Sequence, residues 1–177
     1  MLFRSQIIVQ ITAAAADAEA IVLSDYAKGV VTPSVIAAAI AAARAARVPL
    51  LVDPKVPQAE RYRGATLITP NHHEAEVMTQ MPIRGIDDAR EAARRLHERT
   101  GANVLITWGE HGMWVLDQSG ATPIEEALPA SAREVSDVTG AGDTVISVLA
   151  LALAAGGPLS DRKSTRLNSS HVSESRM

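Results

Sequence analysis

The residues best suited to chemistry lie in one short segment, in which positions 137–144 read Asp-Val-Thr-Gly-Ala-Gly-Asp-Thr. An apolar run, Val145 to Ala155, follows it and predicts a helix that begins near Gly140. The first N–H groups of a helix are unpaired and partly positive, and Gly140 and Gly142 would let a phosphate approach them closely. Asp143 would then take a proton from an alcohol while a phosphoryl group is held beside it. The alternative is that Asp143 only caps a glycine-rich helix start.

Alternating strands and helices are expected before this segment. Short apolar runs that end in polar residues predict buried strands at residues 21–25, 49–53, 65–69 and 103–107. A fifth strand at 112–116, joined to the fourth by a hairpin or bulged turn, and an edge strand at 121–124 are expected next. The predicted helices span residues 32–47, 72–80, 87–100 and the apolar run after Gly140. This order predicts one α/β domain with a mostly parallel sheet and helices on both faces.

Polar residues at the strand ends should meet at one edge of this sheet, where such folds bind ligands. After the third strand, Asn71 and Glu74 are spaced to face the same side of a helix start, where they could hold hydrated Mg²⁺ and phosphate oxygens. The alternative is a capping box made by the same two residues, and both can hold together. Lys55, after the second strand, would counter phosphate charge or would be a solvated surface lysine.

The fourth strand is followed by a glycine-containing turn. Thr107, Gly109 and Gly112 offer a hydroxyl group and bare backbone to a phosphate, or they form an ordinary hairpin. The five histidines lack the spacing of a metal site, so we expect them to be surface or structural residues.

Composition limits the classes of function. The chain has 177 residues, which is enough for one domain with a core, and it contains no cysteine, which excludes disulfides and thiolate metal sites. A formal net charge of −3 gives no argument for nucleic acid binding. No apolar run is long enough to span a bilayer, so no membrane association and a cytoplasmic location are expected.

Several motifs, read in order, resemble a known enzyme family. They are Ser-Asp-Tyr-Ala-Lys-Gly from Ser24, Asp-Pro-Lys from Asp53, Asn-x-x-Glu from Asn71, Thr-x-Gly-x-x-Gly from Thr107 and the segment 137–144. Together they resemble the ribokinase-like (phosphofructokinase-B) sugar kinases over residues 18–156. Residues 23–29 and 60–71 (ERYRGATLITPN) are similar to one subgroup, the D-glycero-β-D-manno-heptose 7-phosphate kinases that are fused to a heptose 1-phosphate adenylyltransferase.

The resemblance implies a Rossmann-like three-layer α/β/α ribokinase fold and ATP-dependent phosphorylation of a sugar phosphate. In the subgroup, heptose 7-phosphate becomes the 1,7-bisphosphate, a precursor of ADP-heptose and of the lipopolysaccharide core. The cofactors implied are ATP and Mg²⁺, with a monovalent cation near Asp137 and Thr139, and the parent protein would be a homodimer. The alternatives are another sugar or pyrimidine-alcohol kinase of this family, or a nucleotide-binding fragment without catalysis.

The resemblance also implies roles for single residues. Asp143 would be the base that deprotonates the anomeric hydroxyl, and the anion hole would be formed by Gly140, Ala141 and Gly142. Asn71 and Glu74 would organise Mg²⁺ and phosphates. The residues on the nucleotide side would be Thr107, Gly109 and Gly112. The residues facing the sugar substrate would be Asp25, Lys28, Asp53 and Lys55.

Two substitutions and both ends of the chain depart from the family pattern. Val56 stands where the subgroup has Gly, and Trp108 where an Arg is frequent. Residues 161–171 match the translation of a common sequencing-library adapter, and residues 1–5 match its reverse complement. We therefore expect residues 1–5 and 160–177 to be foreign, the latter as a disordered tail. Residues 6–159 would be a partial kinase domain, truncated at both ends without its lid, and therefore weak or inactive.

Overall fold

The computed structural model describes residues 2–55, 57–129 and 141–156. Three residues with expected roles, Asp137, Thr139 and Gly140, lie outside these ranges. Val56 and the expected foreign segment 160–177 lie outside them as well. The helix α1 (Leu2–Ala15) includes residues 2–5, and the expectation that these residues are foreign stays a prediction.

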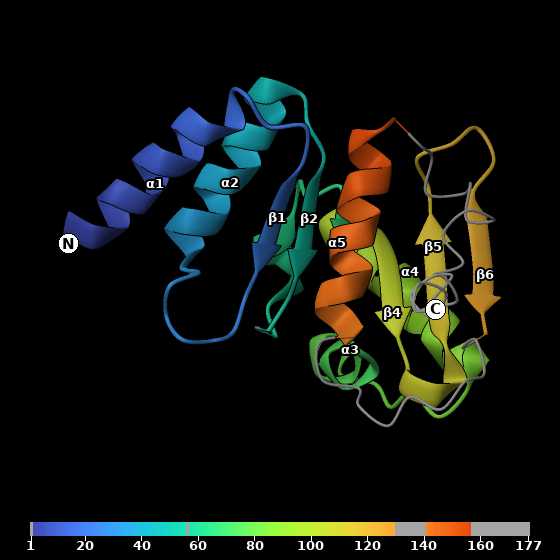
Figure 1. Ribbon diagram of the computed structural model, residues 1–177. Coiled ribbons are helices and arrows are strands. Elements are labelled where there is room, and N and C mark those ends of the chain that lie inside the picture. The colour runs from blue at the N-terminus through green and yellow to red at the C-terminus, as the bar shows by residue number, and fades with distance from the viewer. Residues whose placement is uncertain (1, 56, 130–140, 157–177) are drawn as a thin grey trace, which may run out of the picture.

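The centre of the molecule is a mixed sheet, which confirms the predicted α/β class. Its order follows the chain: β1 (Ile21–Ser24), β2 (Leu50–Asp53), β3 (Leu67–Ile68), β4 (Asn103–Thr107), β5 (Met113–Asp117) and β6 (Ile124–Leu128). The strands β1 to β4 pair in parallel, and β5 and β6 add antiparallel pairs. The carboxyl ends of β1 and β2 therefore point the same way, toward the bottom of Figure 1.

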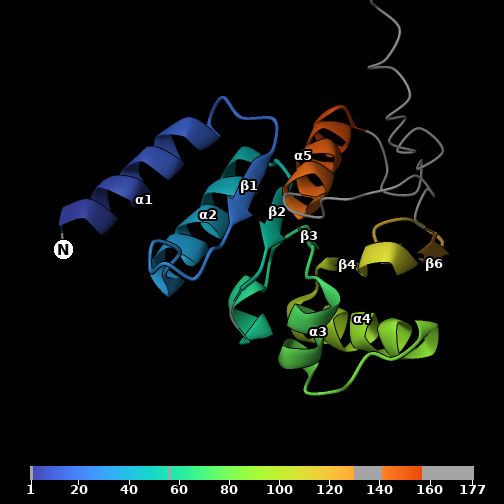
Figure 2. The same ribbon diagram turned by 60° about the horizontal axis from the view of Figure 1, so that its bottom comes forward.

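Helices cover both faces of the sheet, as predicted (Figure 2). The remaining helices are α2 (Pro33–Ala46), α3 (His72–Thr79), α4 (Ile86–Thr100) and α5 (Ala141–Ala154), with short 3₁₀ turns η1 (Ala59–Tyr62) and η2 (Gly109–His111). Successive strand residues point to opposite faces. Accordingly, Leu50 and Val52 of β2 pack in the core beneath α2, α3 and α4, whereas Leu51 packs in a second cluster with residues of α5.

Local sequence signals explain where several helices begin and end. The Thr32 side chain accepts a hydrogen bond from the Val35 N–H, and Pro33 occupies the first helical position of α2. Gly101 ends α4 with a φ of 73°, a left-handed conformation that glycine adopts without steric penalty. These signals fix the connections that carry the chain from one strand to the next.

Two elements differ from the sequence-based expectation. No element was expected for residues 2–15, which form α1, and Ile7, Ile8 and Ile11 of this helix pack against the core beside α2. The expected edge strand at 121–124 was placed too early, since β6 begins at Ile124. The Asp117 side chain accepts hydrogen bonds from the N–H and the hydroxyl of Ser119, which starts the turn. Pro123 cannot donate a ladder hydrogen bond, and the strand begins only after it.

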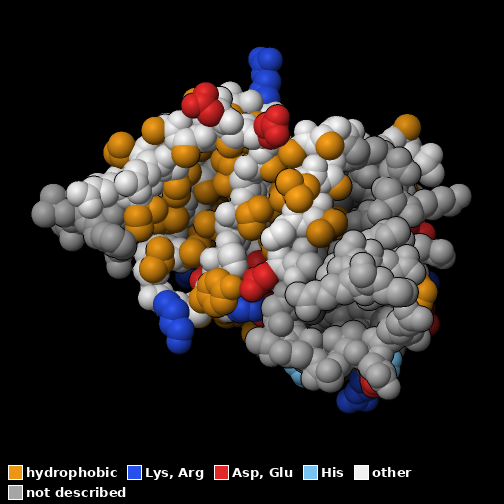
Figure 3. Space-filling model, viewed as in Figure 1, with side chains coloured by type: hydrophobic (Ala, Val, Ile, Leu, Met, Phe, Trp, Pro, Cys, Tyr) orange, Lys and Arg blue, Asp and Glu red, His pale blue; other side chains and the backbone are white. Residues whose placement is uncertain are grey.

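The surface carries some exposed apolar side chains (Figure 3). Val9 of α1, Val22 of β1 and Leu151 of α5 are 66%, 42% and 73% exposed. Within the described ranges, every helix is either too short or too polar to cross a bilayer.

The layered core predicts which leucines matter for stability. Leu96 of α4 is fully buried against the sheet, so Leu96→Ala should lower the free energy of unfolding by about 2–5 kcal/mol. Leu151→Ala removes the same atoms from an exposed site and should change it by less than about 0.5 kcal/mol. Urea unfolding followed by circular dichroism measures both. Equal losses in the two variants would contradict this assignment of the core.

Candidate active site

The predicted site residues lie where the carboxyl ends of the parallel strands meet the start of α5. In Figure 1 this helix begins at the bottom of the sheet, toward which the strands β1 and β2 point, and it contacts both strands. The parallel register pairs Ser24 with Asp53, so β1 and β2 end at the same level. Asp25, the pair Asp53 and Lys55, and Asp143 come from three distant parts of the sequence and are thereby brought to one edge.

Asp143 lies in the first turn of α5 and is exposed at this edge. The hydroxyl of Tyr26 donates to its carboxylate, with distances of 3.3 Å to Oδ1 and 3.1 Å to Oδ2. Sequence reasoning did not select Tyr26. The available signal was its position in the loop after β1, directly between Asp25 and the residues that lead to Lys28.

Lys55 is held between carboxylates from two elements. Its ammonium group forms an ion pair with Glu74 Oε1 and lies 4.0 Å from Asp53 Oδ2. Burial lowers the pKa of Lys55, but the hydrogen bond to Glu74 and the charges of Asp53, Glu74 and Asp143 outweigh burial and raise it. The lysine is therefore charged and held toward Glu74 and Asp53. This arrangement argues against the alternative that Lys55 is a freely solvated surface residue.

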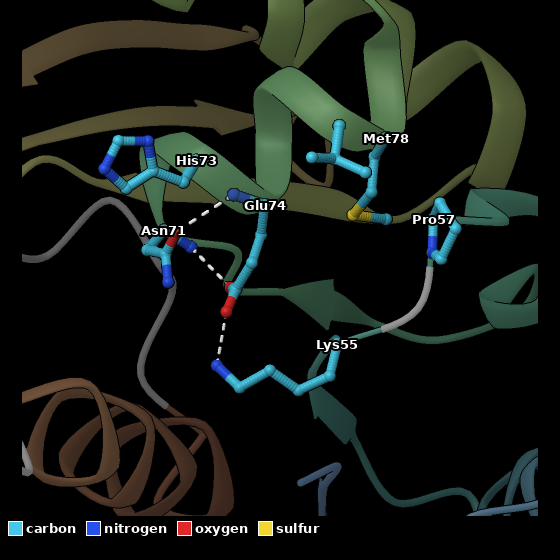
Figure 4. Close-up of a pocket in the computed structure, with 7 residues that line it drawn as sticks. Lys55, Pro57, Asn71, His73, Glu74 and Met78 are labelled. Carbon is cyan, nitrogen blue, oxygen red and sulfur yellow. Dashed lines mark hydrogen bonds and ion pairs between the residues drawn. The ribbon is translucent and has the colours of Figure 1, made fainter. Parts of the chain in front are cut away.

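Asn71 and Glu74 form the capping box that the sequence offered as an alternative. The Asn71 side chain accepts from the Glu74 N–H at 2.9 Å, and Glu74 Oε2 accepts from the Asn71 N–H at 2.8 Å. The other carboxylate oxygen of Glu74 faces Lys55 (Figure 4). These residues border a pocket of about 240 Å³, lined by Lys55, Pro57, Asn71, His73, Glu74, Val77 and Met78.

Asp53 experiences an unusual electrostatic environment. Burial raises its pKa from 3.8 to about 6; Lys55 opposes this shift, while the nearby charges of Glu74, Asp143 and Asp25 add to it. Asp25 is itself only 2% exposed, and its Oδ1 accepts from the Ala27 N–H at 2.8 Å. Several carboxylates thus share a small volume at the strand ends, an arrangement typical of a functional site.

The turn after β4 borders the same edge. A bridge pairs Thr107 with Asn71, and the Thr107 N–H donates to the Pro70 carbonyl oxygen. Gly109 and Gly112 have φ values of 52° and 90°, which bring the backbone around η2 without a side chain in the way. The sequence also allowed an ordinary hairpin, and this turn does join the antiparallel strands β4 and β5.

Lys28 is less closely connected to the other predicted site residues. It is exposed in the loop after β1, and no hydrogen bond or ion pair among the described residues joins it to Asp53, Lys55 or Asp143. Gly142 lies at the start of α5, as expected, and is exposed.

Mg²⁺ fits this site only through water and phosphate. Both carboxylate oxygens of Glu74 already accept hydrogen bonds, and within the described ranges no three His, Asp or Glu side chains converge as a protein-only metal site requires. Mg²⁺ characteristically keeps several waters and binds through one or two carboxylates together with substrate phosphates. The carboxylate of Glu74 and the side-chain amide of Asn71 would supply the oxygen chemistry for such a hydrated ion.

Comparison with known proteins identifies the family. The sequence pattern of the pfkB family carbohydrate kinases matches residues 4–162. The chain belongs to this family. It is 50% identical over 147 residues to Bifunctional protein HldE from Azorhizobium caulinodans, which covers 83% of this chain and 30% of that protein. The identity to Bifunctional protein HldE from Pelobacter propionicus is also 50%, over 82% of this chain and 30% of that protein. This pfkB chain therefore spans about 30% of the length of these relatives.

Solved structures support the fold. Arabidopsis thaliana ribokinase complexed with ribose and ATP superimposes with a TM-score of 0.68 at 24% identity, covering 82% of this chain and 46% of that one. Phosphofructokinase-2 from Escherichia coli in complex with fructose-6-phosphate gives a TM-score of 0.65 at 21% identity, over 86% and 50%. The pfkB chain therefore has the ribokinase fold that the sequence predicted.

The raised pKa of Asp53 predicts a pH dependence of stability. Because the folded pKa of about 6 lies above 3.8, the folded state binds more protons in this window, and stability is lost as the pH rises through about 6. The amide of Asp53→Asn does not titrate, so this variant does not lose stability in this way. The difference in free energy of unfolding between the variant and the unsubstituted chain should therefore shift in favour of the variant by about 1 kcal/mol between pH 4 and pH 7, after allowing for solvent screening.

Glu60→Gln is the matched control with the opposite sign. The hydrogen bond from Arg99 lowers the pKa of Glu60 to about 2, so its contribution to stability is present above its ordinary range and lost as the pH falls. Relative to the unsubstituted chain, this variant should lose stability as the pH rises from 2 to 5. Urea unfolding across the pH range measures both trends, and an Asp53→Asn curve parallel to that of the unsubstituted chain would contradict the shift.

Proposed function

We propose that the protein transfers a phosphoryl group from ATP to the anomeric hydroxyl of a sugar phosphate, D-glycero-β-D-manno-heptose 7-phosphate. The family match and the HldE relatives support a sugar kinase. The choice of a heptose phosphate rests on the subgroup motifs at residues 23–29 and 60–71. The product is the 1,7-bisphosphate, a precursor for ADP-heptose and the lipopolysaccharide core.

The observation that carries this proposal is the position of Asp143. Its carboxylate is exposed at the strand-end edge, in the first turn of a helix whose N–H groups carry partial positive charge. The Tyr26 hydroxyl donates to it, and its charge acts on Asp53 and Lys55, so a base and a cationic group share one edge. A carboxylate that served only as a helix cap would need no such neighbours.

The proposed step is an in-line displacement. Asp143 accepts the proton of the anomeric hydroxyl, the sugar oxygen forms a bond to the γ-phosphorus, and the bond from that phosphorus to the bridging oxygen breaks, releasing ADP. The N–H groups at the start of α5, with Gly140, Ala141 and Gly142, hold the transferred group. Lys55 offsets its negative charge, and Asp25, Lys28 and Asp53 face the sugar.

Mg²⁺ and the nucleotide would lie on the side of α3 and the β4–β5 turn. When bound, Mg²⁺ neutralises charge on the phosphates and draws them together. Asn71 and Glu74 would hold its water ligands, while Thr107, Gly109 and Gly112 approach the nucleotide with a hydroxyl group and backbone. We also propose a monovalent cation near Asp137 and Thr139, a homodimeric parent protein and a cytoplasmic location.

A panel of substrates tests the proposed activity. The protein is restored to the length of its HldE relatives and supplied with ATP and Mg²⁺ together with heptose 7-phosphate, fructose 6-phosphate or ribose, and ADP release is measured. The kcat/KM for heptose 7-phosphate should exceed the others by at least about 10-fold, since contacts to the substrate decide discrimination. A preference for another sugar would reassign the substrate. ATP binding in calorimetry without turnover on any of them would favour a nucleotide-binding fragment.

Replacement of the proposed base tests the mechanism. Asp143→Asn keeps the size of the side chain but accepts no proton, so kcat should fall by about 10²–10⁴-fold while ATP binding is largely retained. Asp17→Asn is the control. Asp17 is an exposed carboxylate that precedes the amino end of β1, whereas the proposed site lies at the carboxyl end of this strand. Steady-state kinetics and calorimetry measure the two quantities. Equal kcat values for both variants would exclude Asp143 as the base.

A further inference from the structure

The hydrogen bond between Tyr26 and Asp143 has no part in the roles proposed so far. The phenol must be its donor, because an ionised carboxylate only accepts. The two residues are 117 positions apart in the sequence, so the contact forms only when the loop after β1 docks beside the start of α5. It therefore joins two elements of the site directly at the proposed base.

The loop backbone directs Tyr26 toward this contact. On one side, the Asp25 N–H donates to the Asp53 carbonyl oxygen at 3.1 Å, and the buried Asp25 Oδ1 accepts from the Ala27 N–H at 2.8 Å. On the other side, Ala27 has a φ of 53°, a left-handed conformation that alanine rarely adopts. Such a conformation persists only where surrounding contacts impose it. The backbone on both sides of Tyr26 is thus held by structure, although the residue is 59% exposed.

Charged groups from several elements lie near Asp143. Asp53 ends β2 and Lys55 follows it, and the charge of Asp143 acts on both; Asp25 and Glu74 act in turn on Asp53. A hydroxyl that donates to the Asp143 carboxylate fixes its orientation among these groups. The 3.3 Å and 3.1 Å distances show that it spans both oxygens and leaves further lone pairs for a sugar hydroxyl.

We infer that Tyr26 is a positioning residue for Asp143: its hydroxyl holds the carboxylate in the orientation in which it accepts the sugar proton. This inference rests on the proposed function and deepens it at the same site. Tyr26 acts through Asp143 and exchanges no proton with the sugar.

Tyr26→Phe removes only the hydroxyl and tests this role in the full chain. The kcat for heptose 7-phosphate should fall about 10- to 100-fold, as small misplacement of a reacting group does, with the KM values for sugar and ATP nearly unchanged. Tyr62→Phe removes a hydroxyl from the other tyrosine, which is buried in the core, and should leave kcat and both KM values unchanged. An unchanged kcat in Tyr26→Phe, or a raised KM with the same kcat, would overturn the inference.

A double-variant cycle tests the contact without reference to activity. Thermal midpoints are measured for the unsubstituted chain, Tyr26→Phe, Asp143→Asn and the double variant. Loss of the hydroxyl should lower the midpoint less when residue 143 is Asn, whereas additive shifts would overturn the inference. Turnover is measured in the protein restored to the length of its HldE relatives, and its absence there would overturn the proposed function and the positioning role with it. Turnover in that protein that Tyr26→Phe leaves intact would overturn the positioning role alone.

Discussion

The crowding of carboxylates around Lys55 is the constraint on which the site depends. Asp53, Glu74 and Asp143 all act on this ammonium group, and Asp25 lies close enough to act on Asp53. Like charges so near one another oppose folding unless a cation or a proton offsets them. Burial is the main cause of the raised pKa of Asp53, and the charges of Glu74, Asp143 and Asp25 raise it further. A bare triphosphate would be repelled by the same carboxylates. A phosphate that arrives with Mg²⁺ brings the positive charge that the edge lacks.

The sheet makes this crowding possible because parallel strands deliver their carboxyl ends to one edge. Ser24 pairs with Asp53, so β1 and β2 end at the same height in the sheet. Asn71, which follows β3, pairs in the same way with Thr107 at the end of β4. A slip of one residue in either register would turn the buried leucines and valines to the wrong face. The hydrophobic core therefore fixes the relative positions of the charged groups, which gain little from being brought together.

Much of this arrangement follows from local sequence, and the rest depends on contacts that no local pattern records. The helices and parallel strands were predicted because their apolar periods, N-caps and glycine stops are local. Strand ends then located Asp53 and Glu74. The contact of Tyr26 with Asp143 joins segments 117 residues apart, and no spacing rule predicts it. The α1 helix was missed because its isoleucines pack on a neighbouring helix, and β6 was placed early because Pro123 delays the strand.

Glu74 shows that a local structural role and a role at the site need not compete. One of its oxygens completes the capping box with Asn71, and the other faces Lys55. The capping box fixes the carboxylate at the first turn of α3. The hydrogen bonds of the helix start therefore offset the conformational entropy that the Glu74 side chain loses on being ordered. The carboxylate then orients the lysine. A residue that seemed to present two competing explanations thus joins helix stability to the electrostatics of the strand-end edge.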